Sequence, residues 1–378
     1  MTGTVRPAAG RPGPPEPCRR KVMFDQTAAL ADDLTEQSPR FALQASGLLS
    51  QEEWASVDRV YLTGSGDSYH ASCAAEMAFE SLAGVPCEPL SSLRFLEYGT
   101  DGMSAVGGNN LVIATSASGG TRRVLQCAER ARHHGVRTVA LTGVADSPLT
   151  RTCDRSMVID VPRLERSPGI RTHQASLVGL LMIAIRLGEA RGMYASAAAN
   201  ALRGELSALA GPMNATVDAI RERCRQVAHL ISDAPVVVMI GAGPGLGTAL
   251  FGAAKIVEAS AVFAMGQDLE EWCHVERFAD PIDTPLFLLS CPGRAHSLAG
   301  AVAARATALG RQVIAVVPAE DTVVTPYAHT VLPVYGTTRE EFSPLLYGLF
   351  APYTAAFLAE RLGRLPFRAG CPGPGPAH

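Results

Sequence analysis

The chain has 378 residues, which is more than one hydrophobic core usually supports, so we expect two domains. Its net charge of -3 is too small to hold nucleic acid or an anionic membrane surface, and neither kind of partner is predicted. The nine cysteines include no C-x-x-C pair, which favours reduced thiols in a cytoplasmic protein and excludes the common zinc clusters. We therefore expect neither a metal site nor a bound cofactor.

Composition along the chain divides it into five segments. Both ends are rich in Pro and Gly, and the N-terminal end lacks the apolar run of a signal peptide. The longest apolar runs inside the chain are too short to span a bilayer. We expect a disordered tail (1–22), an α/β domain that opens with a helix near Phe24 (23–190), a helical connection (191–231), a second α/β domain (232–366) and a second disordered tail (367–378).

A strand followed by a glycine turn occurs twice along the chain. The runs VYLTGSGDSYHAS (60–72) and VVVMIGAGPGLGTAL (236–250) carry glycine pairs that begin at Gly64 and at Gly241. A second buried run follows in each half and ends at Ser116 and at Ser290, with nearly the same separation between the two copies. Matching features that are separated by nearly the same number of residues predict an internal duplication.

The order of elements in each half predicts the fold class. Each half alternates strands with helices, and its strands are continuously apolar, as strands buried on both faces are. This predicts an α/β fold of two domains, each a parallel sheet flanked by helices in a flavodoxin-like α-β-α sandwich. Ligands of such folds bind beyond the carboxyl ends of the strands, so the loops after Leu62 and Thr115 are the places to look.

The loop SASGGT, residues 116–121, follows a buried strand and opens a helix. Its hydroxyls, glycines and free N–H groups at a helix N-terminus are suited to a phosphate, although a simple helix cap is the alternative. The glycine loop after Leu62 reaches the same edge and adds a hydroxyl, unless it is only a tight turn. The predicted phosphate-binding residues are Gly66, Ser68, Ser116, Ala117, Ser118, Gly119 and Thr121.

The corresponding loop of the second half begins at Ser290. It continues with Cys291 and Pro292, so the repeated hydroxyls are gone and proline removes one N–H donor. We therefore expect one phosphate loop per chain.

Several of these segments resemble one family. GSGDSYHAS, FESLAGVPCEPLSSLRFLEYG, SASGGT and ALFGAAKIVEAS resemble the isomerase half of glucosamine-6-phosphate synthase and its tandem sugar-isomerase (SIS) domain relatives, from about Phe24 to about Leu365. The resemblance implies two SIS domains and a homodimer with shared active sites. It also implies an isomerase, deaminase or deglycase that acts on a hexose or hexosamine 6-phosphate through an enediol or enolamine.

The resemblance also assigns roles to individual residues. It implies that Glu258 shuttles a proton, with Lys255 on the same helix, and that His274 assists ring opening from the partner subunit. It further implies that Arg171, with Ser167 and Thr172, lines the pocket.

The residue chemistry fits these roles. Glu258 lies in an almost purely apolar helix, where burial lifts a carboxylate pKa towards neutrality, and Lys255 falls on the same face. A buried ion pair that only ties helices together is the alternative for this pair. His274 can exchange a proton near neutral pH, but a lone histidine is also an ordinary residue at many positions.

Two departures from the synthase pattern bear on the reaction. A glutaminase domain is not expected, because Thr2 and a Pro-rich tail replace the terminal cysteine that it needs, and PFRAGCPG carries no counterpart of the synthase's tail lysine. Two alternatives stay open beside the isomerase or deaminase. One is an ammonia-dependent synthase, with or without a separate amidotransferase partner, and the other is a phosphosugar sensor without catalysis.

Overall fold

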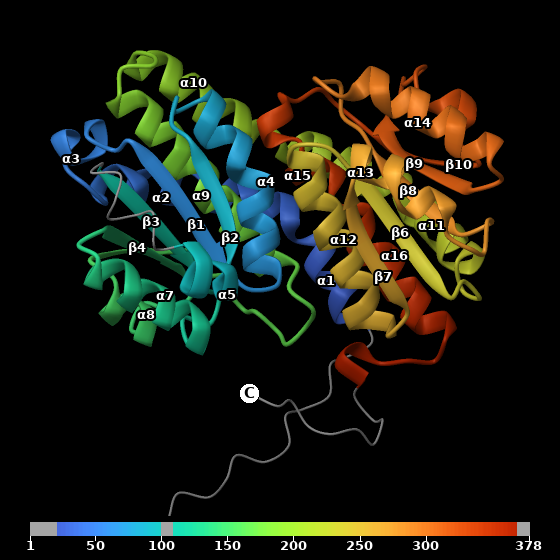
Figure 1. Ribbon diagram of the computed structural model, residues 1–378, viewed down its shortest axis with the longest axis horizontal. Helices are drawn as coiled ribbons and strands as arrows, with labels where there is room; N and C mark the ends of the chain where they lie inside the picture. The colour runs from blue at the N-terminus through green and yellow to red at the C-terminus, as the bar shows by residue number, and fades with distance from the viewer. Residues whose placement is uncertain (1–20, 100–108, 369–378) are drawn as a thin grey trace, which may run out of the picture.

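The computed structural model describes residues 21–99 and 109–368 (Figure 1). Most of the two predicted tails lies outside these ranges. Helix α1 (Val22–Ala28) begins inside the predicted N-terminal tail, and Val22 is only 1% exposed because it packs into the core. The short turn η5 (Pro366–Arg368) likewise extends into the predicted C-terminal tail. The predicted domain boundaries themselves stay predictions.

Ten strands in residues 21–99 and 109–368 form two parallel sheets of five. The strand order is β2-β1-β3-β4-β5 in the first sheet and β10-β9-β8-β6-β7 in the second, which is the same order when each sheet is numbered from its own first strand. The predicted α/β fold with two parallel sheets is confirmed, whereas a common origin by duplication stays a prediction. The strands are β1 (Arg59–Gly64), β2 (Cys87–Ser91), β3 (Asn110–Thr115), β4 (Arg137–Thr142), β5 (Arg155–Val158), β6 (Val236–Gly241), β7 (Phe263–Asp268), β8 (Pro285–Leu289), β9 (Gln312–Pro318) and β10 (Thr330–Val334).

Helices cover both faces of the first sheet. Helices α4 and α9 pack on the face towards the second half, and α7 packs on the outer face. The elements of this half and of the connection are α2 (Leu30–Gly47), α3 (Gln51–Ala55), α4 (Asp67–Ser81), α5 (Ser92–Arg94), η1 (Phe95–Gly99), α7 (Arg122–His133), α8 (Pro148–Thr152), α9 (Arg171–Ala190), α10 (Ser196–Ala208) and α11 (Ala210–Leu230).

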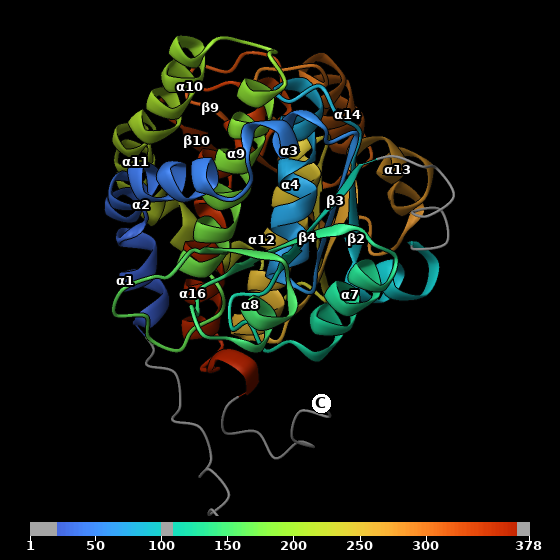
Figure 2. The ribbon, with the colours of Figure 1, turned by 90° about the vertical axis from the view of Figure 1, so that its left-hand side faces the viewer.

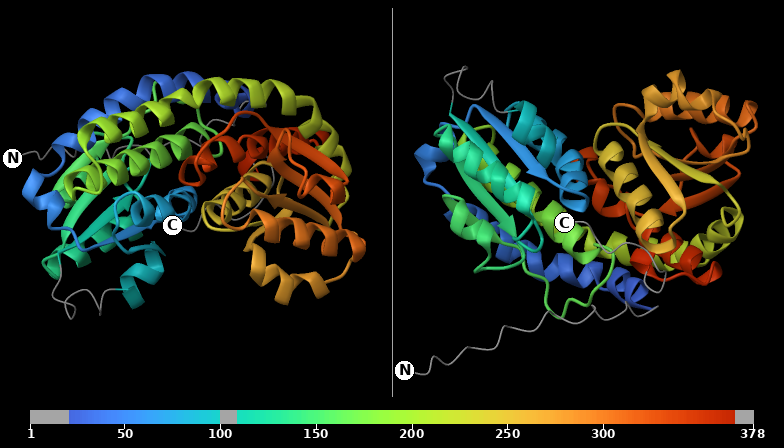
Figure 3. Two further views of the ribbon diagram at one scale, coloured as in Figure 1. Left: turned by 90° about the horizontal axis from the view of Figure 1, so that it is seen from above. Right: turned by 60° about the horizontal axis from the view of Figure 1, so that its bottom comes forward.

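The second sheet is covered in the same way. Helices α11, α12 and α16 pack on its inner face, and α13 and α14 pack on its outer face. The elements of this half are α12 (Pro244–Ser260), α13 (Leu269–His274), η2 (Glu276–Phe278), α14 (His296–Ala308), η3 (Thr325–Tyr327), η4 (Glu340–Phe342), α15 (Pro344–Tyr347) and α16 (Phe350–Arg361). In Figure 3 the blue and yellow-green helices form a layer along one side of both halves.

One continuous core joins the two halves. Successive residues of a strand point to opposite faces, so Leu62 of β1 belongs to this shared core while Tyr61 belongs to a smaller outer core. In the second sheet Met239 and Ile240 of β6 divide in the same way. The two halves are therefore packed through their inner helices into a single body.

Helices α4 and α12 lie side by side at the centre and run in opposite directions (Figures 1 and 2). Their backbones approach so closely that a Cβ on Gly247 would lie 2.4 Å from the Ala74 nitrogen. The start of α4, at Asp67, therefore meets the end of α12, near Glu258. Each of the two helices begins at the carboxyl edge of its own sheet. Because they run in opposite directions, the end of α12 lies beside the start of α4, at the carboxyl edge of the first sheet.

Within the part of the chain that the structure describes, one segment, Glu340–Arg361, is long and apolar enough to cross a membrane by length and composition alone. Its most apolar window is 89% buried inside the protein. Burial in the core accounts for this apolar composition.

Candidate active site

Lys255 and two carboxylates form an ion-pair cluster between the two halves. The Lys255 Nζ donates to Asp67 Oδ2 at 2.6 Å and to Glu258 Oε2 at 2.5 Å. The lysine side chain is fully buried, while those of Asp67 and Glu258 are 19% and 30% exposed. The cluster is therefore open to solvent on the side of its carboxylates, where a ligand can reach Glu258.

The surroundings shift the pKa values of the Asp67 and Glu258 carboxylates in opposite directions. Burial raises the pKa of Glu258 above its ordinary value, and the neighbouring Asp67 charge adds to this while the Lys255 ammonium opposes it. Burial acts on Asp67 in the same direction, but the Lys255 ammonium and further partners outweigh it and hold the Asp67 pKa below its ordinary range. Asp67 thus stays ionised as the partner of Lys255, whereas Glu258 takes up a proton more readily than an ordinary glutamate.

His173 of α9 supports the cluster from the protein interior. Its ring stacks on Phe251 with the centroids 3.9 Å apart, and its Nδ1 lies 3.2 Å from the Asp67 carbonyl oxygen. Burial lowers the pKa of His173 to about 4, so the imidazole is neutral at neutral pH. A neutral ring adds no second positive charge beside Lys255.

Replacing His173 by phenylalanine should weaken the pH dependence of stability. The folded-state pKa of about 4 lies below the ordinary 6.5, so the unfolded chain takes up a proton first as the pH falls. As the pH falls from 7 to 4, we expect this group to lower the free energy of unfolding of the wild type by about 3 kcal/mol. Denaturant titrations at several pH values measure this loss. If the free energy of unfolding depended on pH equally in the wild type and in His173→Phe, the prediction would be contradicted.

The SASGGT loop lies at the carboxyl end of β3. The Ser116 Oγ and the Thr121 Oγ1 are 2.9 Å apart and hydrogen-bond to each other, and the Ser118 Oγ accepts from the Gly120 N–H. Thr121 is the N-cap residue of α7, yet its side chain caps no backbone N–H. The hydroxyls are thus gathered at this helix N-terminus without serving as its cap.

Gly119 fixes the conformation of this loop, in which Ala117 also lies. It has a φ of +63°, and a Cβ there would come within 2.2 Å of Ser147. The Ala117 carbonyl accepts a hydrogen bond from the Gly143 N–H at 3.0 Å, which ties the loop to the end of β4. The loop is therefore held by its neighbours before any ligand arrives.

The first glycine loop lies next to it, because β1 pairs with β3. Gly66 has a φ of +56° and precedes α4 directly, as Gly243, with a φ of +51°, precedes α12. Ser68 is buried in the first turn of α4, and Ser65 hydrogen-bonds to Ser92 at 2.6 Å. Both predicted loops therefore lie at one edge, and Asp67, which directly follows Gly66, binds Lys255 there.

Two predicted residues have partners elsewhere. The Arg171 guanidinium donates to both carboxylate oxygens of Asp33 at 2.6 Å and to the Pro162 carbonyl, so its donors serve to anchor α9 to α2. His274 lies at the end of α13, its side chain 65% exposed, with Nε2 2.9 Å from a Glu270 carboxylate oxygen. Neither residue shares a contact with the Lys255 cluster among those found in the described residues.

Sequence reasoning missed Asp67 and His173. Asp67 stands inside the glycine loop that the sequence singled out, and a carboxylate at the start of a helix is usual there, so it gave no separate signal. His173 is far from both Asp67 and Glu258 along the chain and belongs to no motif that they share. Only the packing of α9 beside α4 brings it next to the cluster.

The carboxyl edge of the second sheet does not repeat this cluster. When the two glycine turns are aligned, Gly64 on Gly241, the positions that correspond to Asp67, Lys255 and Glu258 are Pro244, Ala78 and Ser81. None of these three side chains can act as a base of that kind. The three residues of the Asp67–Lys255–Glu258 cluster therefore have no counterparts at these positions of the second edge.

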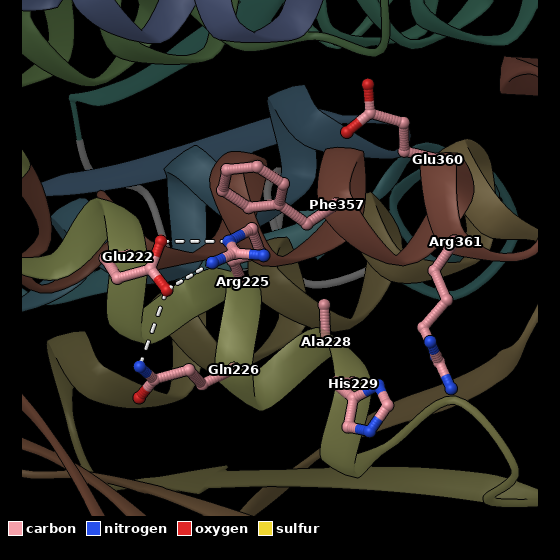
Figure 4. Close-up of a pocket in the computed structure, with 8 residues that line it drawn as sticks. All are labelled: Glu222, Arg225, Gln226, Ala228, His229, Phe357, Glu360 and Arg361. Atoms are coloured by element: carbon pink, nitrogen blue, oxygen red, sulfur yellow. Dashed lines mark hydrogen bonds and ion pairs between the residues drawn. The ribbon is translucent and has the colours of Figure 1, made fainter.

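An open hollow of about 640 Å³ lies elsewhere, between α11 and α16 (Figure 4). It is lined by charged groups such as Glu222 and Arg225, which pair with each other at 2.6 Å and are more than half exposed. None of the predicted site residues lines it. We therefore place the candidate active site at the edge of the first sheet.

Comparison with protein families identifies the first half. Residues 54–186 match the profile of the SIS domain family. Residues 54–186 are thus identified as a SIS domain within the first half of the chain. This range includes β1, α4 and the SASGGT loop, so the SIS domain supplies Asp67 and the hydroxyl loop of the candidate site.

Relatives beyond the SIS domain extend over most of the chain. The chain is 26% identical over 318 residues to the glutamine–fructose-6-phosphate aminotransferase of Gloeobacter violaceus, covering 83% of this chain and 51% of the relative. It thus spans about half the length of this relative. The predicted resemblance to SIS-domain phosphosugar enzymes is confirmed.

Solved structures share the whole architecture. The C-terminal domain of glucosamine-fructose-6-phosphate aminotransferase from Francisella tularensis has a TM-score of 0.77 at 16% identity, covering 91% of this chain and 97% of that one. Glucosamine-6-phosphate deaminase from Thermotoga maritima has a TM-score of 0.70 at 17% identity, covering 91% and 96%. At such identities the likeness concerns the fold, which extends beyond the matched SIS domain.

Proposed function

We propose that this protein is a phosphosugar isomerase or an amino-sugar-phosphate deaminase or deglycase that acts on a hexose or hexosamine 6-phosphate. The observation that carries the proposal is the delivery of Glu258, with a raised pKa, to the edge where the SASGGT loop lies. The names of the relatives, an aminotransferase and a deaminase of sugar phosphates, are consistent with this substrate class.

The phosphate would bind at the SASGGT loop. Ser116, Ser118 and Thr121 present hydroxyls at the N-terminus of α7, where the helix dipole favours an anion. Gly66 and Ser68 line the neighbouring loop and would contact the sugar. Anchoring the phosphate in this way fixes the distance from it to C1 and C2 of the sugar.

The proton transfer would be carried out by Glu258. Its carboxylate takes a proton from one of the two carbons C1 and C2, and the enediol or enolamine that results takes the proton back on the other carbon. Lys255 stabilises negative charge at this point, and Asp67 holds Lys255 in place. A carboxylate with a raised pKa suits this reaction because it gives up the proton as readily as it takes it.

His274 is proposed to act in the site of a second copy. It is exposed at the end of α13, as a residue supplied across a dimer interface would be in a single chain. An enzyme that sediments as a monomer and is fully active would contradict this part of the proposal.

Replacing Thr121 by valine should weaken substrate binding. The change removes a hydroxyl but keeps the shape, and the loss of a hydrogen bond to a charged phosphate costs about 1.5 to 3 kcal/mol, or about 10- to 150-fold in affinity. Titration with the phosphosugar or with inorganic phosphate measures it. Thr152→Val is the control, because the Thr152 hydroxyl bonds the Pro148 carbonyl of its own helix α8. Equal affinities of all three proteins would contradict the phosphate assignment.

A substrate screen tests the function itself. Hexose and hexosamine 6-phosphates are screened by thermal shift, since a bound ligand raises the melting temperature, and the binders are then assayed for isomerisation and ammonia release. We expect turnover that is lost in Glu258→Gln. Binding without turnover would favour the phosphosugar sensor, and product that forms only with added ammonia would favour the ammonia-dependent synthase.

A further inference from the structure

A cavity lies at the amino edge of the second sheet, on the face that α13 covers. It has a volume of about 120 Å³, whereas one water molecule in the liquid takes up about 30 Å³. Apolar residues of β6, β7, β8 and α13 form much of its wall: Val236, Val238, Met265, Trp272 and Leu286. Its polar lining consists of Glu276, Asp280, Thr284 and Arg311. The candidate active site contains none of these residues.

Arg311 places a buried cation at this cavity. The residue is only 2% exposed, and its Nε is buried without a hydrogen-bond partner among the described residues. Burial lowers the pKa of Arg311 while Asp280 and Asp283 act to raise it, and a guanidinium stays protonated at neutral pH. The two terminal nitrogens donate to backbone carbonyls of the segment between α13 and β8, those of Glu276, Arg277, Ala279 and Pro281. Within the described residues the guanidinium thus has carbonyl partners but no carboxylate bonded to it.

Glu276 lines the same cavity and has one unsatisfied carboxylate oxygen. Its Oε1 accepts from the Gln267 Nε2 at 2.8 Å, whereas its Oε2 is buried and has no partner in the part of the chain that the structure describes. The Glu276 carbonyl accepts from the Arg311 Nη2 at 3.1 Å, so the two residues are close neighbours. A buried polar atom without a partner is rare and costly, and here a donor and an acceptor of this kind belong to residues of one cavity.

We propose that this cavity binds a small free amino acid, of the size of glycine or alanine, in its zwitterionic form. The carboxylate of the amino acid accepts a hydrogen bond from the Arg311 Nε, and its ammonium group donates to the Glu276 Oε2. A zwitterion satisfies both atoms because it brings the opposite charge to each, and it adds no net charge to the cavity. Asp280 and Thr284 provide further acceptor oxygens in the lining.

The volume of the cavity limits the size of the amino acid. A cavity of about 150 Å³ holds benzene, so one of about 120 Å³ admits a slightly smaller molecule. Glycine and alanine are within this limit, and the methyl group of alanine can pack on the apolar wall that includes Trp272. Leucine and glutamine exceed the limit. Ala279 and Asp280 are exposed, so the ligand can enter from solvent beside them.

Ligands with a single charge fit the same residues less well. A simple carboxylate such as acetate would pair with Arg311 but would leave the Glu276 Oε2 without a donor, next to a second negative charge. A simple amine such as ethylammonium would pair with Glu276 but would leave the Arg311 Nε without an acceptor. Binding therefore requires both charged groups on one small molecule.

Calorimetric titration of the full chain with glycine and with L-alanine tests the proposal. We expect saturable binding of both amino acids and at least about tenfold weaker binding of acetate, ethylammonium and L-leucine. Glu276→Gln keeps an acceptor for Gln267 but removes the charge that meets the ammonium group, so it should weaken glycine binding at least about tenfold. Arg311→Lys keeps the positive charge but removes Nε and should weaken binding as well. If Arg311→Lys does not fold, the result for Glu276→Gln decides.

Two control variants separate this cavity from its surroundings. Glu271→Gln changes an exposed glutamate of α13, and Glu258→Gln changes the proposed phosphosugar site, so both should bind glycine as the wild type does. The proposal would be overturned by a folded wild type that binds neither amino acid, by acetate that binds as tightly as glycine, or by an unchanged affinity in folded Glu276→Gln. A crystal soaked in glycine that shows only water in the cavity would overturn it too. Failure here would leave the phosphosugar assignment intact, because the two sites share no residue.

Discussion

Glu258→Gln is expected to lower kcat about 10²- to 10⁴-fold without unfolding the protein. The rate falls because an amide cannot take a proton from carbon, and general-base catalysis contributes about this much. Stability is retained because the raised pKa of Glu258 means that folding favours its neutral form, which glutamine resembles. Steady-state kinetics on the substrate found by screening, together with denaturant titration, measure both effects.

The pH profile provides a second check on Glu258. Since the pKa of this group lies above its ordinary value of 4.5, kcat/KM should rise with pH through that higher pKa as the carboxylate ionises. The acidic limb should vanish from the residual activity of Glu258→Gln. Glu360→Gln, at the exposed end of α16, is the control and should behave as the wild type. An unchanged kcat in Glu258→Gln would remove this residue from the mechanism.

Lys255→Met is expected to damage both stability and activity. It keeps the length of the side chain but leaves Asp67 and Glu258 as neighbouring carboxylates without their cation. Removing one partner of a fully buried pair costs about 3 to 5 kcal/mol, and the partial exposure of both carboxylates reduces this to about 2 to 4 kcal/mol. The loss of charge stabilisation should also lower kcat about 10²-fold or more.

A second substitution separates the two effects of Lys255→Met. Adding Asp67→Asn removes one of the stranded charges, so the double variant should regain part of the lost unfolding free energy but none of the activity. Denaturant titration of the single and double variants measures the recovery. A Lys255→Met protein as stable and as active as the wild type would show that the ion pairs have no role.

The sequence predicts those features that depend on local pattern. Continuously apolar strands and the glycine turns at Gly64 and Gly241 predict two parallel sheets, and the structure has them. Glu258 and Lys255 could be paired from sequence because residues three apart share a helix face, and the 2.5 Å contact between them follows from that spacing.

Features that depend on how the halves pack could not be predicted. The contact of Lys255 with Asp67 joins distant parts of the chain and exists only because α4 and α12 cross closely at Gly247. The pairing of Arg171 with Asp33 has the same origin, since α2 and α9 meet only in the folded chain. The exposure of His274 is a further example, because its predicted role needs a second subunit.

A crystal structure with a bound hexose or hexosamine 6-phosphate tests the central claim most directly. The account predicts that the phosphate accepts hydrogen bonds from Ser116, Ser118 and Thr121 while C1 and C2 lie within about 3.5 Å of the Glu258 carboxylate. A phosphate bound away from this loop, or a sugar whose C1 and C2 lie out of reach of Glu258, would contradict it.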